Sequence, residues 1–142
     1  MKRKIRTYLR VKTDYPIPEA GQSGGEEIAP FLANALRETG FNASEAENGE
    51  FAYFIRCPSG QRVYEIMIGY NFGGGSTWEI SCPPILGSFS RLMGKSEDND
   101  LLPVITAIDR AMRSNTHVQE MFWYRSYGGR RHGSALFVEH AN

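Results

Sequence analysis

The chain has few residues that could cross-link it covalently and no segment that would anchor it in a bilayer. Only two cysteines occur, Cys57 and Cys82, and two are too few for a disulfide framework in 142 residues. Each falls at the end of a predicted strand, where we expect a free, buried thiol. No apolar run approaches the roughly 20 residues of a membrane span, and the basic start lacks the apolar core of a signal peptide. We therefore expect a cytoplasmic protein.

An overall excess of charge of one sign is also missing, since 16 basic residues balance 16 acidic ones. Nucleic-acid-binding modules usually carry a basic excess, because neutralising phosphates supplies much of their affinity. The distribution along the chain is nevertheless uneven. Residues 1–12 hold six basic and no acidic side chains, whereas residues 13–51 hold eight acidic side chains and one basic residue, Arg37. The chain is therefore dipolar.

Motifs for catalysis, metal binding or nucleotide binding are absent as well. The histidines are scattered at His117, His132 and His140, and no CxxC, HxH or HExxH occurs. Gly94–Ser96 looks like the end of a phosphate-binding loop, but the glycine required five positions earlier is Phe89. We expect no metal, no cofactor and no enzymatic activity.

What the chain does contain is strong apolar periodicity. Alternation of apolar and polar residues predicts strands, with a short edge strand as the last, optional one. These strands are residues 5–12, 50–57, 62–70, 77–82, 118–127 and 134–138.

Two stretches show helical periodicity instead. The first carries Ile28, Leu32 and Leu36 on one stripe and is expected to stop at Gly40. Ser23 and Glu26 have the spacing of a capping box for this helix, but Pro30 would then sit awkwardly inside it. The start therefore stays open between the capping box and a point nearer Pro30.

The second helical stripe runs from Leu101 through Ile105 and Ile108 to Met112. We expect Asp100 to cap this helix, with Pro103 in its first turn. The element order is then β-α-β-β-β-α-β in a single α+β domain spanning residues 1–142. We expect a two-layer sandwich, in which a five- or six-stranded, mainly antiparallel sheet carries both helices on one face.

Aromatic residues interleaved with arginines near the end of the chain form one candidate binding surface. Such a mixture can stack bases and hold phosphates, and it also dominates protein–protein hot spots. The alternative is an ordinary strand followed by a basic loop. Alternation puts Trp123 and Tyr124 on opposite faces, so one should lie outside the core unless both faces are covered. The candidates are Trp123, Tyr124, Arg125, Tyr127, Arg130 and Arg131.

Glu45, Glu47 and Glu50 form a second candidate, expected in a loop beside Asn48 and Gly49. A solvated loop would explain them. Alternatively, together with the loop of residues 14–25, they present an acidic surface to a positively charged protein. The basic first strand could also lie beside them and neutralise them.

Several segments together resemble a family of small, uncharacterised bacterial cytoplasmic proteins of the toxin-immunity type. They are the loop from Tyr15 to Gly25, the helix IAPFLANALRETGF, the strand TWEISCPP, the link ILGSFSRLMGK and the closing Phe122–Tyr124. The resemblance implies a non-enzymatic module that binds and neutralises a toxin encoded nearby. It supplies no catalytic residues. The alternative is a nucleic-acid-binding or regulatory module that uses the basic N-terminal strand and the arginine-aromatic segment.

Overall fold

The computed structural model describes residues 2–19, 22, 24–71, 75–82, 97–124, 133 and 136–139. Eight strands and two helices lie in these parts of the chain. In chain order they are β1 (Lys2–Ile5), β2 (Tyr8–Thr13), α1 (Ile28–Glu38), β3 (Glu47–Asn48), β4 (Ala52–Ser59), β5 (Arg62–Tyr70), β6 (Thr77–Ser81), α3 (Glu97–Ser114), β7 (Val118–Tyr124) and β8 (Leu136–Glu139).

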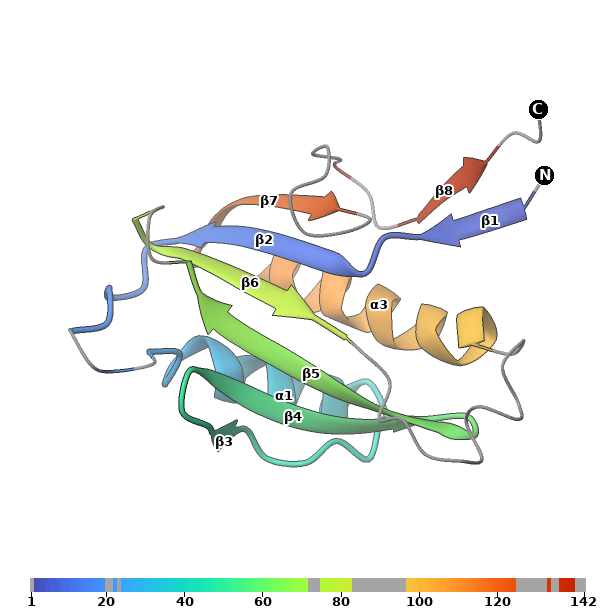
Figure 1. The fold of residues 1–142 in the computed structure, drawn as a ribbon, viewed down its shortest axis with the longest axis horizontal. Coiled ribbons are helices and arrows are strands. Elements are labelled where there is room, and N and C mark those ends of the chain that lie inside the picture. Colours follow the sequence, from blue (N-terminus) through green and yellow to red (C-terminus); the bar gives the residue numbers. More distant parts are fainter. Residues whose placement is uncertain are drawn as a thin grey trace.

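Six of the strands form one antiparallel sheet in the order β3-β4-β5-β6-β2-β7. Figure 1 shows α1 and α3 behind this sheet, on the same side of it. The remaining strands, β1 and β8, pair antiparallel in a separate two-stranded sheet. The predicted α+β architecture, a six-stranded antiparallel sheet with two helices packed on it, is confirmed.

The core lies between the sheet and the helices. Strand alternation points every second side chain toward the helices, and the apolar stripe of each helix meets them. The predicted helix residues Leu32, Leu36, Ile105 and Ile108 are all at most 1% exposed. On the sheet, the fully buried partners are Leu9, Val11, Ile55, Ile66, Ile68 and Ile80.

The predicted strand 5–12 is wrong as a single element. The chain leaves the two-stranded sheet after Ile5 and enters the main sheet at Tyr8. Arg6, expected on the wet face of one strand, lies in the link between the two strands and is only 8% exposed, whereas β2 keeps the predicted alternation. The optional strand 134–138 is present as β8, but it pairs with β1 and not with the edge of the main sheet.

Of the two helix starts, α1 agrees with the expected alternative of a start near Pro30, and α3 differs from the prediction. The N-cap of α1 is Glu27, so the capping box is not used, and Ser23 lies outside the described residues. Pro30 then falls in the first turn, where its missing N–H is harmless. In contrast, α3 begins at Glu97, so Asp100 is not its cap and Pro103 lies inside the helix beyond the first turn.

Asp100 instead binds the turn between β4 and β5. Its backbone oxygen accepts a hydrogen bond from Ser59 Oγ at 2.6 Å. The turn residue Gly60 has a φ of 60°, and a Cβ built on it would overlap the Asp100 carboxylate. A glycine is therefore required at this position both by the backbone conformation and by the contact with α3.

Replacing Gly60 with alanine should destabilise the fold by more than its backbone conformation alone costs. The positive φ should cost about 1–2 kcal/mol, and the overlap with Asp100 adds to this. Gly75 has nearly the same φ, 67°, with no atom within 4 Å of its built Cβ, so Gly75→Ala is the matched control. Urea unfolding should show the larger loss for Gly60→Ala. Equal losses would mean that Asp100 does not constrain the turn.

Truncating Ile108 to alanine should lower the free energy of unfolding by about 2–5 kcal/mol, because the side chain is 1% exposed. Thr106→Ala, on the exposed side of the same helix, should change it by less than about 0.5 kcal/mol. Urea denaturation of both variants measures the difference. An Ile108→Ala variant as stable as the wild type would contradict the assigned packing face of α3.

Candidate functional site

The three predicted glutamates lie together on the hairpin of β3 and β4. Glu47 belongs to β3, Glu45 precedes it, and Glu50 lies in the turn that joins the strands. The Gly49 N–H donates to the Ala52 carbonyl at 2.8 Å and closes this turn. All three glutamate side chains are exposed.

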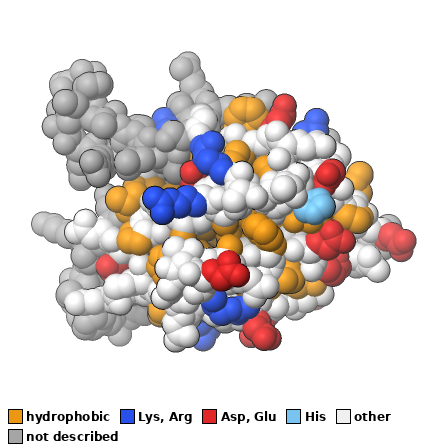
Figure 2. Space-filling model, turned by 180° about the vertical axis from the view of Figure 1, so that it is seen from behind, with side chains coloured by type: hydrophobic (Ala, Val, Ile, Leu, Met, Phe, Trp, Pro, Cys, Tyr) orange, Lys and Arg blue, Asp and Glu red, His pale blue; other side chains and the backbone are white. Residues whose placement is uncertain are grey.

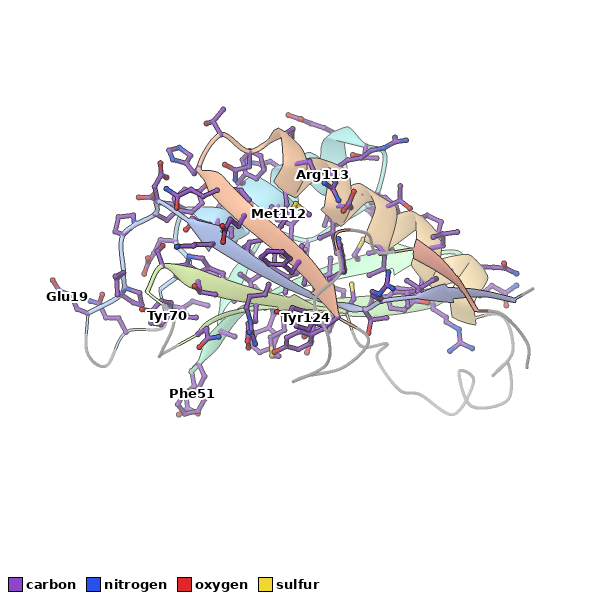
Figure 3. The ribbon with its side chains drawn as sticks, turned by 90° about the horizontal axis from the view of Figure 1, so that it is seen from above. Glu19, Phe51, Tyr70, Met112, Arg113 and Tyr124 are labelled. Carbon is purple, nitrogen blue, oxygen red and sulfur yellow. The ribbon has the colours of Figure 1, made fainter. Side chains whose placement is uncertain are left out.

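Phe51, the second residue of the turn, is 78% exposed. Figure 3 shows its ring pointing away from the molecule on the side of the sheet opposite the helices. Sequence alternation grouped Phe51 with Tyr53 and Ile55 on a strand face. Because β4 starts only at Ala52, Phe51 lies in the turn and its side chain does not belong to that face. The turn of this hairpin thus carries an exposed aromatic ring next to Glu50 in the sequence, with Glu45 and Glu47 on the strand side of the same hairpin. We call residues 45–51 the acidic hairpin.

A hollow of about 140 Å³ adjoins the acidic hairpin. Cross-strand pairing explains its composition, because Glu47 pairs with Phe54 and Arg56 pairs with Glu65. Directly paired residues project from the same face of a sheet. The lining residues are Ser44, Glu47, Phe54, Arg56 and Glu65.

Two local features hold this hollow in place. Ser44 donates its N–H to the Arg56 carbonyl and accepts the Arg56 N–H on Oγ, both at 2.8 Å, which fixes the preceding segment along β4. Gly49 provides room for the Phe54 ring, since a Cβ there would lie 2.5 Å from Phe54 Cε2. Among the described residues, no ion pair joins Arg56 to Glu47 or Glu65.

The basic strand does not neutralise the acidic hairpin. In the main sheet β2 is separated from β3 by three strands, which places them about 19 Å apart at the usual strand spacing. Arg10 of β2 instead pairs with Glu79 of β6, with Nη2 and Oε1 2.8 Å apart. Partial burial lowers the pKa of Arg10, whereas the hydrogen bond to Glu79 raises it. The resulting pKa of Arg10 lies above its ordinary value.

The aromatic candidates are buried on both faces of the sheet. Trp123 is 1% exposed, and its Nε1–H donates to Asp109 at 2.8 Å. Tyr124 faces the other way but is only 3% exposed, with Arg10 5.1 Å above its ring and Tyr8 edge-on to it. Neither ring offers much surface to a partner. The other four candidates, Arg125, Tyr127, Arg130 and Arg131, lie outside the described residues.

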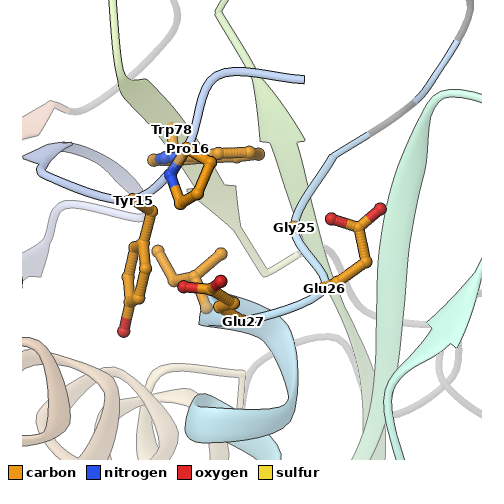
Figure 4. Close-up of a pocket in the computed structure, with 7 residues that line it drawn as sticks. Tyr15, Pro16, Gly25, Glu26, Glu27 and Trp78 are labelled. Atoms are coloured by element: carbon orange, nitrogen blue, oxygen red, sulfur yellow. The ribbon is translucent and has the colours of Figure 1, made fainter. Parts of the chain in front are cut away.

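A second, smaller hollow lies where the loop after β2 meets the start of α1. Figure 4 shows Tyr15, Pro16 and Trp78 on one side of it and Gly25 to Glu27 on the other. Its volume is about 30 Å³, roughly the share of one water molecule in the liquid. This space suits a bound water and is too small for a ligand.

His117 forms a contact at the surface with the loop after β2. Its Nδ1 lies 2.7 Å from Asp14 Oδ1, and its ring stacks on Tyr15 at 4.7 Å between centroids. Asn115 donates to the hydroxyl of the same tyrosine. No hydrogen bond within the described parts joins His117 to a serine, threonine or cysteine. The predicted turn position of this histidine is confirmed.

Neither cysteine is poised for reaction. Burial raises the pKa of Cys57 to about 11, and burial together with the neighbouring Cys57 raises that of Cys82. Nucleophilic and metal-binding cysteines need the thiolate, which these environments disfavour. In the part of the chain that the structure describes, no three His, Cys, Asp or Glu side chains gather as metal ligands.

The helix side of the molecule carries charges of both signs. Figure 2 shows acidic side chains gathered near the histidine at the right of the view and basic side chains mainly at its left and centre. Within the described ranges, no helix is both long and apolar enough to cross a membrane. Comparison with family models, with known proteins and with solved structures found no match to this chain.

Iodoacetamide should label neither Cys57 nor Cys82 in the native protein and both in urea, because their buried thiols stay protonated. Mass spectrometry counts the labelled sites. Thr106→Cys, which places a thiol on the exposed side of α3, serves as the reactive control. Native labelling of either natural cysteine as fast as that control would show that its strand opens readily.

Proposed function

We propose that this chain is a non-enzymatic, cytoplasmic protein-binding module that neutralises a positively charged toxin. The observation that carries the proposal is the acidic hairpin, which presents Phe51, 78% exposed, and the exposed side chains of Glu45, Glu47 and Glu50. The resemblance to immunity proteins supplies the toxin as the class of partner, and the rest of the argument comes from the surface.

A protein fits this surface better than a small molecule. Protein interfaces combine a few apolar, often aromatic, anchors with a polar rim. The hairpin offers an exposed aromatic ring at its turn and three exposed carboxylates along it. Small-molecule sites usually enclose about 300–1,000 Å³, whereas the two described hollows measure about 140 and 30 Å³.

A basic partner follows from the charges. The three hairpin glutamates make no ion pair among the described residues, and Arg56, which lines the hollow beside Glu47, does not pair with it. The basic strand β2 lies beyond the screening length of about 8 Å at physiological salt. Unpaired carboxylates on a protruding hairpin attract a cationic surface and speed its encounter. An inhibitor that acts by covering its target needs such complementarity and no chemistry of its own.

Binding of nucleic acid has less support. Base stacking needs exposed rings, and Trp123 and Tyr124 are at most 3% exposed. Arg10 already forms an ion pair with Glu79. A nucleic-acid surface would therefore depend on the other basic residues of the N-terminal strands, Lys2, Arg3 and Lys4 of β1 and Lys12 of β2, and on the arginines that lie outside the described residues.

Reversing Glu45, Glu47 and Glu50 together to lysine should slow association with the toxin encoded by the neighbouring gene. Loss of electrostatic steering should lower the association rate about 10- to 100-fold at low salt, with a much smaller change in the dissociation rate. Stopped-flow mixing at several salt concentrations measures both rates. In cells, the variant should protect less well against the co-expressed toxin.

Reversal of Glu19, Glu38 and Glu120, exposed glutamates elsewhere on the surface, is the control with the same change in net charge. It should associate faster than the hairpin variant, and both should unfold at the wild-type midpoint. Equal association rates for the two variants would mean that the hairpin glutamates are solvated and do not contribute to binding. A neighbouring gene product that is harmless to cells would remove the toxin from the proposal.

A further inference from the structure

We propose that the hollow beside the acidic hairpin receives one arginine side chain of the protein partner. The hollow is lined by Ser44, Glu47, Phe54, Arg56 and Glu65. This inference rests on the proposed function, because it names the chemical group through which the basic partner is recognised. Three properties of the hollow support it, namely its size, its charge and its aromatic wall.

The size fits one side-chain head group. At about 140 Å³, the space corresponds to roughly four or five water molecules at about 30 Å³ each. A planar guanidinium fills such a space, whereas a nucleotide or a drug-sized ligand does not.

The charge of the lining calls for one cation. Glu47 and Glu65 are acidic and Arg56 is basic, so the lining carries one net negative charge. Arg56 forms no ion pair with either glutamate in the described parts of the chain, and both carboxylates therefore remain available. An incoming guanidinium would bring the lining to neutrality and could donate to a carboxylate with two N–H groups at once.

The aromatic wall favours arginine over lysine. Phe54 lines the hollow, and Gly49 beside it leaves room for the ring. A guanidinium plane stacks on an aromatic ring while its edge donates to carboxylates, whereas the compact, strongly hydrated ammonium of lysine does this less well. Glu47 belongs to both the hairpin and the hollow, so one partner surface can contact Phe51 and insert its arginine nearby.

The test uses small probes and needs no toxin. N-acetylarginine methylamide is titrated into the full chain labelled with ¹⁵N, and amide shifts are followed by NMR. The expected result is a saturable shift confined to residues 44–56 and 65. The isosteric, uncharged N-acetylcitrulline methylamide should bind about tenfold more weakly, since it lacks the charge-assisted hydrogen bonds. The lysine analogue should fall between the two.

Variants then locate the site. Glu65→Gln keeps the shape of the lining and removes one charge, so it should weaken arginine binding several-fold. Glu120→Gln, on β7 at the far edge of the sheet, should not. Gly49→Ala should move the Phe54 ring and reduce the preference for arginine over lysine.

Equal binding of the arginine and citrulline probes, or shifts that ignore Glu65→Gln, would overturn the inference. So would shifts centred elsewhere, or no saturable shift with the arginine probe. None of these outcomes touches the proposed function, whose test is the association rate of the hairpin variant with the toxin. Conversely, arginine binding in the hollow would stand even if the neighbouring gene product proved harmless.

Discussion

Burial of one face of the six-stranded sheet under α1 and α3 is the constraint on which the other features depend. A strand slipped by one residue would send all of its apolar side chains to the wrong face, so the register is fixed. With that register, Ile55 and Ile66 point into the core while Phe54, Arg56 and Glu65 point to the opposite side. The hollow on the open face is thus positioned by packing on the other one.

The same geometry closes the edge of β4 against further strand pairing. The backbone N–H and carbonyl groups of every second β4 residue point away from β5. Those of Phe54 face β3, which pairs with β4 at this residue. Ser44 satisfies both the N–H and the carbonyl of Arg56. At the next outward position Pro58 has no N–H to offer. An edge blocked in this way resists strand addition, so the proposed partner would be contacted at this end of the sheet by side chains, Phe51 above all.

The sequence predicted the features that periodicity controls and missed those that depend on distant contacts. Helical stripes and strand alternation identify the two layers, because each reflects a single buried face. Asp100 has the residue type of a helix cap, but it binds the β4–β5 turn, a contact that only the fold creates. The strand expected over residues 50–57 begins only at Ala52, and the turn falls on Glu50 and Phe51. This later start leaves the Phe51 ring exposed.

Charge segregation along the chain translates only partly into charge segregation in space. Folding places Arg10 beside Glu79, and Asp14 beside His117. Other acidic residues of the segment 13–51 lie at the two ends of α1, and in the sequence they are distant from the hairpin turn. The hairpin glutamates make no ion pair within the described residues, although Arg56 of the adjacent β4 lines the same hollow as Glu47. Acidic side chains and the protruding Phe51 therefore lie on one hairpin at the edge of the sheet. The proposed binding would depend on this local arrangement rather than on the net charge of the segment.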